Sequence, residues 1–267
     1  IKEVLINIVP TNPVSAFIDG NMLQIIFMAL LFGVVLTLIK DEKSEIIVKL
    51  LDGINDIFIQ VVHVVMKLAP YGVLALSAAV IGQYGTDILV TLLKYFLVVL
   101  GGLIFYTLSV NSFFLRVLGN TNPLTFFKAV KEAIVIAFST SSSMATLPVA
   151  MENVESLGVR REYSSFVIPL GATINMDGTA LYQGVSAVFI AQIYGIELGL
   201  AGQVTIILMA VLSSIGAAGV PMAGIIALAL VLKQLGIPME GIALILGVER
   251  LLDMVRTSTN VIGNMAC

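Results

Sequence analysis

The stretch that decides the fold of this chain reads Asn175-Met176-Asp177-Gly178-Thr179. It puts an amide, a carboxylate, a helix-breaking glycine and a hydroxyl inside the long apolar segment 163–194. An unpaired charge at the centre of a bilayer costs about 2.5–3.5 kcal/mol on insertion scales. The segment therefore predicts a membrane helix that is broken in its middle, where a partner compensates the polar groups.

The composition is that of an all-α, polytopic membrane protein. Of the 267 residues, 58% are hydrophobic and 12% are charged, and the mean hydropathy is +1.05. Soluble domains carry about 25% charged residues. A single cysteine excludes an internal disulfide framework, and a single histidine argues against a His/Cys metal site. The net charge of −3 argues against a nucleic-acid partner.

Apolar runs divide the chain into spans, because about 20 apolar residues cross a hydrocarbon core about 30 Å thick. Residues 21–39 and 88–118 are such runs. Residues 46–68 are more amphipathic, are interrupted at Pro70-Tyr71-Gly72, and resume over 73–81. The last span, 239–267, carries polar residues along its length: Glu249, Arg250, Asp253, Arg256, Asn260 and Asn264.

Two segments depart from this pattern and indicate an internal repeat. Residues 123–157 and 198–235 each contain two short apolar runs around a polar tip, at 139–148 and 213–221. Each is followed by a span with polar residues in its middle. Half-length segments at matching positions in two halves point to a transporter's midplane site. The alternative is a pair of surface loops, but the flanking runs are too short and too apolar for full spans on either side.

Basic residues set the expected orientation. Eight of the 14 lie in three connections, as Lys40, Lys43, Lys49, Arg116, Lys128, Lys131, Arg160 and Arg161. The alternate connections, 82–87 and 195–203, contain none. The positive-inside rule places the basic connections in the cytoplasm, so the two tips are expected to enter from opposite sides as re-entrant hairpins.

The last span offers a binding face. Asp253, Arg256 and Asn260 fall at i, i+3 and i+7, with Thr257 beside them. A zwitterion with a side-chain carboxylate matches this face, with its ammonium on Asp253 and its distal carboxylate on Arg256. The alternative is an Asp253–Arg256 ion pair that only neutralises itself, which Asn260 and the nearby hairpins disfavour.

The hairpin tip and the break supply further ligands. Ser142 and Ser143 stand at a helix start, where free amides favour a carboxylate, although they can also serve only as caps. Thr173, Asn175 and Asp177, with the carbonyls around Met176, are hard oxygen ligands suited to Na⁺ or to a carried proton. Asp177 could instead be a structural hydrogen-bond partner between helices.

At these residues the chain resembles the dicarboxylate/amino acid:cation symporter family, the glutamate transporter homologues. The resemblance rests on five stretches: Ile8-Val9-Pro10-Thr11-Asn12-Pro13, the serine tip through Thr146-Leu147-Pro148, 169–180, Ala218-Gly219-Val220-Pro221, and 252–257 with Asn260. It covers essentially the whole chain. Family members are longer at the N-terminus, so the first three spans are expected to be missing here. The third of these helps to build one sodium site.

The resemblance implies a fold of inverted repeats with two re-entrant helical hairpins and two broken transmembrane helices. It implies scaffold spans over 1–85, a transport-domain span over 86–122 and a transport-domain core over 123–267. It also implies a homotrimer. The substrate ligands would be Ser142, Ser143, Thr179, Gly219, Val220, Asp253, Arg256, Thr257 and Asn260. The Na⁺ ligands would be Gly171, Thr173, Asn175, Met176, Asp177, Ser214, Ala217, Asn260 and Asn264.

Three positions depart from the family's pattern. Asn264 stands where sodium-coupled members carry a carboxylate, which weakens one sodium site. Ala217 replaces a hydroxyl residue that some members have in the outer hairpin, although its backbone carbonyl could still serve as a ligand. Ser141 stands where some members have an arginine, so Arg256 must select the side-chain carboxylate alone or with Arg250.

The sequence thus predicts a secondary active symporter of the cytoplasmic membrane that imports glutamate or aspartate with Na⁺ and/or H⁺. A C4-dicarboxylate symporter of the same fold is the alternative, and Asp253 disfavours it because a dicarboxylate has no ammonium. A channel or an inert fragment would need no amine ligand. No nucleophile–base pair and no bound cofactor is expected, so the protein is predicted not to be an enzyme.

Overall fold

The computed structural model describes residues 9–18, 22–39, 42–215 and 219–267, and every regular element among them is helical. The chain forms two compact units, Ile1–Ala69 and Pro70–Cys267. The expected boundaries at residues 85 and 122 remain predictions.

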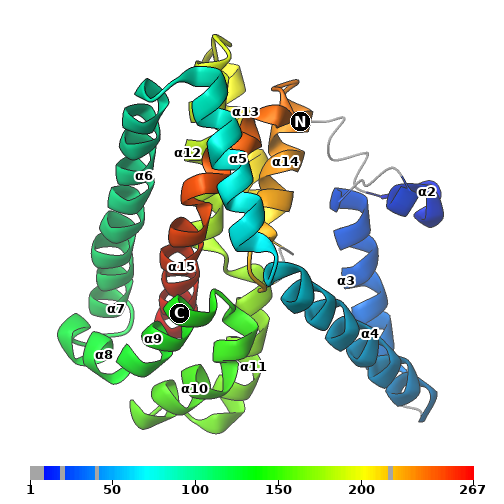
Figure 1. Cartoon of the computed structure of the whole chain (residues 1–267). Coiled ribbons are helices and arrows are strands. Elements are labelled where there is room, and N and C mark those ends of the chain that lie inside the picture. The colour runs from blue at the N-terminus through cyan, green and yellow to red at the C-terminus, as the bar shows by residue number, and fades with distance from the viewer. Residues whose placement is uncertain (1–8, 19–21, 40–41, 216–218) are drawn as a thin grey trace. The chain divides into compact units, whose positions relative to one another are not determined.

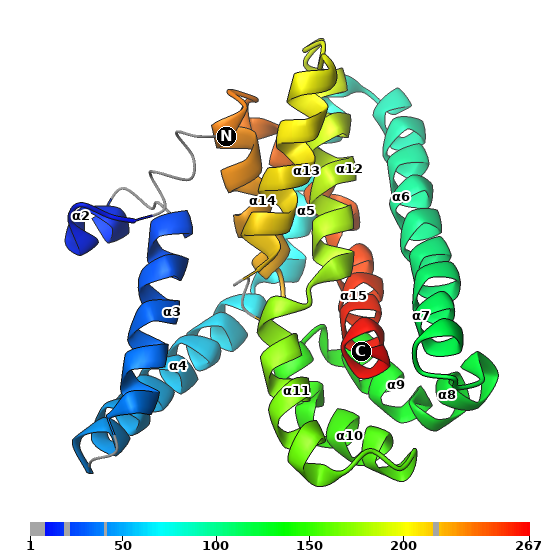
Figure 2. The ribbon, with the colours of Figure 1, turned by 180° about the vertical axis from the view of Figure 1, so that it is seen from behind.

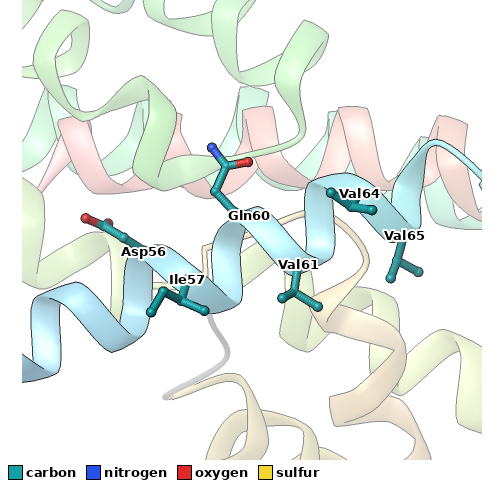
Figure 3. A pocket seen from close by; sticks show the side chains of 6 residues that line it. All are labelled: Asp56, Ile57, Gln60, Val61, Val64 and Val65. Carbon is teal, nitrogen blue, oxygen red and sulfur yellow. The ribbon is translucent and has the colours of Figure 1, made fainter.

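The first unit contains α2 (Pro13–Ile18), α3 (Met22–Leu38) and α4 (Glu42–Met66). The predicted interruption lies at Lys67 and Leu68, between α4 and α5 (Ala69–Tyr84). Pro70 lies in the first turn of α5, where a proline is tolerated. A recess of about 460 Å³ runs along α4. Figure 3 shows Asp56 and Gln60 on one side of this helix and Val61 and Val65 on another. Because every described residue that lines the recess belongs to α4, the recess is an open helix face.

The second unit carries the remaining elements. After α5 come α6 (Asp87–Tyr106), the π-helical turn η1 (Thr107–Asn111), α7 (Ser112–Val117), α8 (Pro123–Ala129), α9 (Lys131–Thr140), α10 (Ser143–Ser156), α11 (Arg161–Ile174), α12 (Asp177–Ile193), α13 (Leu200–Ser214), α14 (Ala223–Gln234), the 3₁₀ turn η2 (Met239–Gly241) and α15 (Ile242–Ala266). The predicted polar tips therefore lie between α9 and α10 and between α13 and α14.

The last helix, α15, is the central element of this unit. It contacts α6, α9, α10, α11, α12 and α14. Figures 1 and 2 show α13 and α14 beside one half of α12 and α15, and α9, α10 and α11 at the other end. The rod formed by α6, η1 and α7 runs along one side (Figure 2).

Two apolar cores pack against different parts of α15. Leu252 belongs to a core with Tyr182 and Leu228, whereas Val261 belongs to a core with Phe126 and Ala133. The polar residues Asp253 to Asn260 lie between these cores on the same helix. Many buried positions are small, among them Ala133, Ala137, Ala150, Ala187 and Ala210. Small residues let membrane helices pack closely. Close packing matters there because the hydrophobic effect does not drive helices together in lipid.

Among the described residues, one continuous helical stretch is long and apolar enough to cross a bilayer by itself. It is Asp87–Val117, with 31 residues and a mean hydropathy of 2.4 in its most apolar window. Leu200–Ser214 and Ala223–Gln234 are shorter apolar helices. Their lengths follow from the breaks at the tips.

Candidate functional site

The break in the apolar segment falls at Asn175 and Met176, which have non-helical backbone angles between α11 and α12. The start of α12 leaves free N–H groups. Asn260 of α15 satisfies two of them, because its Oδ1 accepts from Gly178 N at 2.8 Å and from Thr179 N at 3.3 Å. Its Nδ2 donates to Thr179 Oγ1 at 3.0 Å. The sequence-predicted substrate ligands Asn260 and Thr179 are thus in direct contact.

The serine tip lies against the second tip. Ser141 ends α9 with a φ of 52°, and Ser142 caps α10 by accepting from Ala145 N at 3.2 Å. The Ser142 hydroxyl donates to Gly219 O at 2.9 Å, across 77 residues of sequence. Ser143 is buried next to it. The cap and the contact with the other tip are made by the same hydroxyl.

A buried charge cluster lies on α15. Arg256 donates through Nη1 to Glu249 Oε1 at 3.1 Å and through Nη2 to Asp253 Oδ1. Its guanidinium also stands over the Tyr182 ring, 4.4 Å from the ring centroid. All three charged side chains are at most 2% exposed. Asp253 Oδ2 accepts from Met222 N at 2.9 Å, which ties α15 to the second tip.

Glycine makes room for this guanidinium. A Cβ on Gly224 of α14 would overlap Cζ and both terminal nitrogens of Arg256. Arg256 has no room to yield, since two carboxylates and an aromatic ring hold it from the other sides.

Gly224→Ala is therefore expected to destabilise the protein by about 1–3 kcal/mol, the usual cost of overpacking. The measurement is the thermal unfolding midpoint in detergent. Gly184→Ala is the matched control, because a Cβ there meets no atom within 4 Å and alanine is favoured inside a helix. Equal midpoints for the two variants would contradict the argument.

These residues enclose a small cavity of about 10 Å³, roughly the room that one water molecule needs. Its walls come from both tips, the break and α15: Ser141, Ser143, Met176, Thr179, Gly219, Val220, Ala223, Gly224, Asp253, Arg256, Thr257 and Asn260. All the predicted substrate ligands but Ser142 line it. An amino acid could enter only after a wall moved.

A second polar cluster lies where α11, α12 and α15 meet. With its amide nitrogen facing Asp177, Asn175 lies 2.7 and 3.0 Å from the two carboxylate oxygens. Two glycines make room for these side chains. A Cβ on Gly171 would overlap Asn264 Oδ1, and a Cβ on Gly263 would lie 2.7 Å from Asp177 Oδ2. Among the described residues no group of three His, Cys, Asp or Glu side chains forms a metal site. One carboxylate with amide and carbonyl oxygens suits a monovalent cation better than a divalent one.

Other predicted cation ligands lie differently. Thr173 is exposed, and its hydroxyl donates to Leu170 O of its own helix at 2.9 Å. Ser214 is buried at the end of α13 and donates to Val211 O at 2.8 Å. Met176 lies within 3.3 Å of Asn260 Nδ2 through its sulfur. Ala217 lies outside the described residues.

A larger cavity, of about 890 Å³, lies between α6, α12 and α13. Most of its lining is apolar, including Val98, Leu181, Val188 and Ile206. None of the predicted site residues lines it. Its chemistry differs from that of the charged site on α15.

The family model described as "Sodium:dicarboxylate symporter family" matches residues 1–267. The chain belongs to the sodium:dicarboxylate symporter family. A symporter family implies a membrane protein.

Three relatives that match this chain are named for the substrates that they transport. A proton/sodium-glutamate symport protein of Geobacillus stearothermophilus is 38% identical over 98% of this chain and 62% of its own length. A proton/glutamate-aspartate symporter of Escherichia coli is 38% identical over 99% of this chain and 60% of its own. A C4-dicarboxylate transport protein of Cupriavidus necator is 40% identical over 98% of this chain and 60% of its own. The chain thus spans about three fifths of the length of these relatives.

The sequence indicated no role for three buried residues of α12 and α15. Glu249 pairs with Arg256, Tyr182 lies under it, and Gln183 accepts from Ser213 Oγ at 2.6 Å. The i, i+7 spacing of Glu249 and Arg256 on one helix face was a signal for the first. No local pattern indicates the other two, because their contacts are made between distant helices.

Proposed function

We propose that the protein of which this chain is part is a secondary active symporter. It would import an acidic amino acid, glutamate or aspartate, with Na⁺ and/or H⁺. The observation that carries the proposal is the buried Asp253–Arg256 pair lining one cavity with Thr179, Thr257 and Asn260. An amino acid's ammonium suits Asp253, and its distal carboxylate suits the planar guanidinium of Arg256.

A C4-dicarboxylate is the second candidate substrate, because relatives named as C4-dicarboxylate transport proteins are as similar to this chain in sequence as the glutamate symporters. It would bring two carboxylates to a site that already buries Glu249 and Asp253. Like charges in a buried site repel strongly. Asp253 therefore favours the zwitterion.

The transport architecture is part of the same proposal. The pairs α9–α10 and α13–α14 would be re-entrant hairpins of an inverted repeat in the cytoplasmic membrane, with the second acting as the outer gate. The contacts of Ser142 and Met144 with Gly219 O, at 2.9 and 3.3 Å, support tips that meet. A homotrimer is proposed from the family resemblance alone.

The driving cation would bind at the cluster of Asn175, Asp177 and Asn264, with carbonyls such as that of Gly171. The close approach of these side chains around two glycines supports this placement. Met176, Thr173, Ser214 and Ala217 remain proposed ligands, of which the exposed Thr173 would have to turn inward.

The test is uptake of labelled aspartate into proteoliposomes containing the full-length protein. A Na⁺ gradient is imposed in one arm and a pH gradient in the other, with labelled succinate in parallel. Accumulation of aspartate under at least one gradient is expected. Accumulation of aspartate under neither gradient would overturn the symporter, and accumulation of succinate alone would replace it by the dicarboxylate carrier.

Asn264→Asp is expected to increase the apparent Na⁺ affinity of transport by about tenfold. A tenfold change corresponds to about 1.4 kcal/mol of added attraction between the cation and a buried carboxylate. Asn264 Nδ2 now donates to Ile168 O at 2.8 Å. An aspartate cannot donate, so its oxygen would face that carbonyl and a cation would relieve the repulsion. The measurement is the Na⁺ dependence of aspartate uptake. The exposed Asn120→Asp serves as the control, and a decrease in Na⁺ affinity at position 264 would contradict the placement.

A further inference from the structure

Glu249 is a buried carboxylate that the proposed substrate site does not use. It is 0% exposed and does not line the cavity. Its Oε1 accepts from Arg256 at 3.1 Å, and its Oε2 has no hydrogen-bond partner among the described residues. A buried charged oxygen without a partner is costly, so it calls for a function.

The titratable and charged groups that face Glu249 come from three helices. Arg256 and Asp253 share α15 with it, Tyr182 belongs to α12, and Tyr95 belongs to α6. Tyr95 hydrogen-bonds to Ser186 at 2.8 Å, whereas the Tyr182 hydroxyl lies beside Glu249 without a hydrogen bond of ordinary geometry. The charged residue of α14, Lys233, lies in the last turn of that helix.

Tyr182 and Glu249 are thus neighbours that each have an unused polar atom. A neutral phenol hydroxyl can donate to the carboxylate, so the pair needs no added proton, but it can also accommodate one. The protonated carboxyl gains an O–H donor, which the phenol oxygen can accept.

The charge balance of the cluster favours the added proton. The buried cluster has a net charge of one negative unit, because it contains the carboxylates of Glu249 and Asp253 and the guanidinium of Arg256. Arg250 lies 3.9 Å from Asp253 at the partly exposed edge of this cluster. An acidic amino acid adds one more negative charge. Its distal carboxylate would also compete with Glu249 for Arg256 N–H groups. When it wins, Glu249 loses its hydrogen bond while the local negative charge rises, and both effects favour protonation.

We propose, resting on the proposed symporter function, that Glu249 is the proton-binding residue of the transport cycle. With the substrate site empty, its carboxylate pairs with Arg256. When substrate enters from outside, one proton from the external solution binds to the carboxyl, which then donates to Tyr182. When substrate leaves on the inside, Arg256 pairs with Glu249 again and the proton passes to the cytoplasm.

The test uses full-length protein with Glu249→Gln, which keeps the shape of the protonated carboxyl but cannot release a proton. Accumulation of aspartate driven by a pH gradient is expected to fall at least about tenfold. Exchange of internal for external aspartate requires no net proton movement and is expected to persist at a reduced rate. Glu240→Gln, at an exposed position of η2, is the matched control.

Two further measurements keep the proposal open to refutation if the glutamine variant folds poorly. Proton uptake on adding aspartate to detergent-solubilised protein is followed with a pH indicator, and Glu249→Asp is expected to retain that uptake with a shifted pH midpoint. Absence of proton uptake in the unmodified protein overturns the proposal, as does full pH-driven accumulation by Glu249→Gln. Uptake of protons that survives in Glu249→Gln would assign them elsewhere, with Asp177 the first alternative.

The outcomes separate this proposal from the one it rests on. If the unmodified protein neither accumulates nor exchanges aspartate, the proposed function fails. If it accumulates aspartate only under a Na⁺ gradient and takes up no proton, the function stands and the role of Glu249 fails.

Discussion

Replacing Asp253 by asparagine is expected to lower aspartate uptake by about 100-fold, because the buried ammonium of the substrate would lose its charged partner, which costs about 2–5 kcal/mol. The carboxylate is the proposed ligand of the substrate's ammonium. An asparagine oxygen could still accept from Met222 N, but its NH₂ group would then face Arg256 Nη2, so two donors would oppose each other.

The measurement is kcat/KM for aspartate in proteoliposomes, with succinate as a second substrate that has no ammonium. The loss should be larger for aspartate than for succinate. Asp87→Asn provides the control, since Asp87 is exposed at the start of α6. Unchanged aspartate transport by Asp253→Asn would remove the amine assignment.

Replacing Arg256 by methionine is expected to have the largest effect on stability. Glu249 and Asp253 would remain buried together without a cation, and such uncompensated charge costs about 3–5 kcal/mol. The methionine would still fill part of the space over Tyr182. The measurement is the thermal midpoint and the yield of folded protein in detergent.

A double variant tests the physical cause. Adding Glu249→Gln to Arg256→Met removes one of the two carboxylates and is expected to restore part of the lost stability, so the two substitutions should not be additive. Arg250→Met is the control, because its side chain is 43% exposed and lies 3.9 Å from Asp253. Exposed ion pairs contribute about 0–1 kcal/mol. Additive losses would show that the pair is not the source of the effect.

The sequence predicted the helical pattern well because polar residues in apolar segments have few structural solutions. The break expected at 175–179 lies at Asn175 and Met176, and the last span expected over 239–267 is η2 with α15. The face formed by Asp253, Arg256 and Asn260 followed from helical spacing alone. Their packing against Thr179 and Gly219 could be expected only from the family resemblance.

What the sequence could not predict depends on contacts between distant helices. Nothing near Gly224 indicates that its missing Cβ makes room for Arg256. Likewise, nothing local connects Tyr182 of α12 with Glu249 of α15. Thr173 was expected among cation ligands from its position in the motif, yet its side chain is exposed in the structure. Its ligand role therefore remains a prediction.

The hydrogen bond from Ser142 to Gly219 O has a kinetic consequence for the two tips. One such bond contributes about 0.5–1.5 kcal/mol net, only one to three times the thermal energy at room temperature. Met144 N adds a second, longer bond to the same oxygen at 3.3 Å, and two bonds of this strength still allow the tips to separate often. A bound molecule that both tips touch would then keep the site closed. The time for which the site stays closed would be set by how long that molecule remains bound.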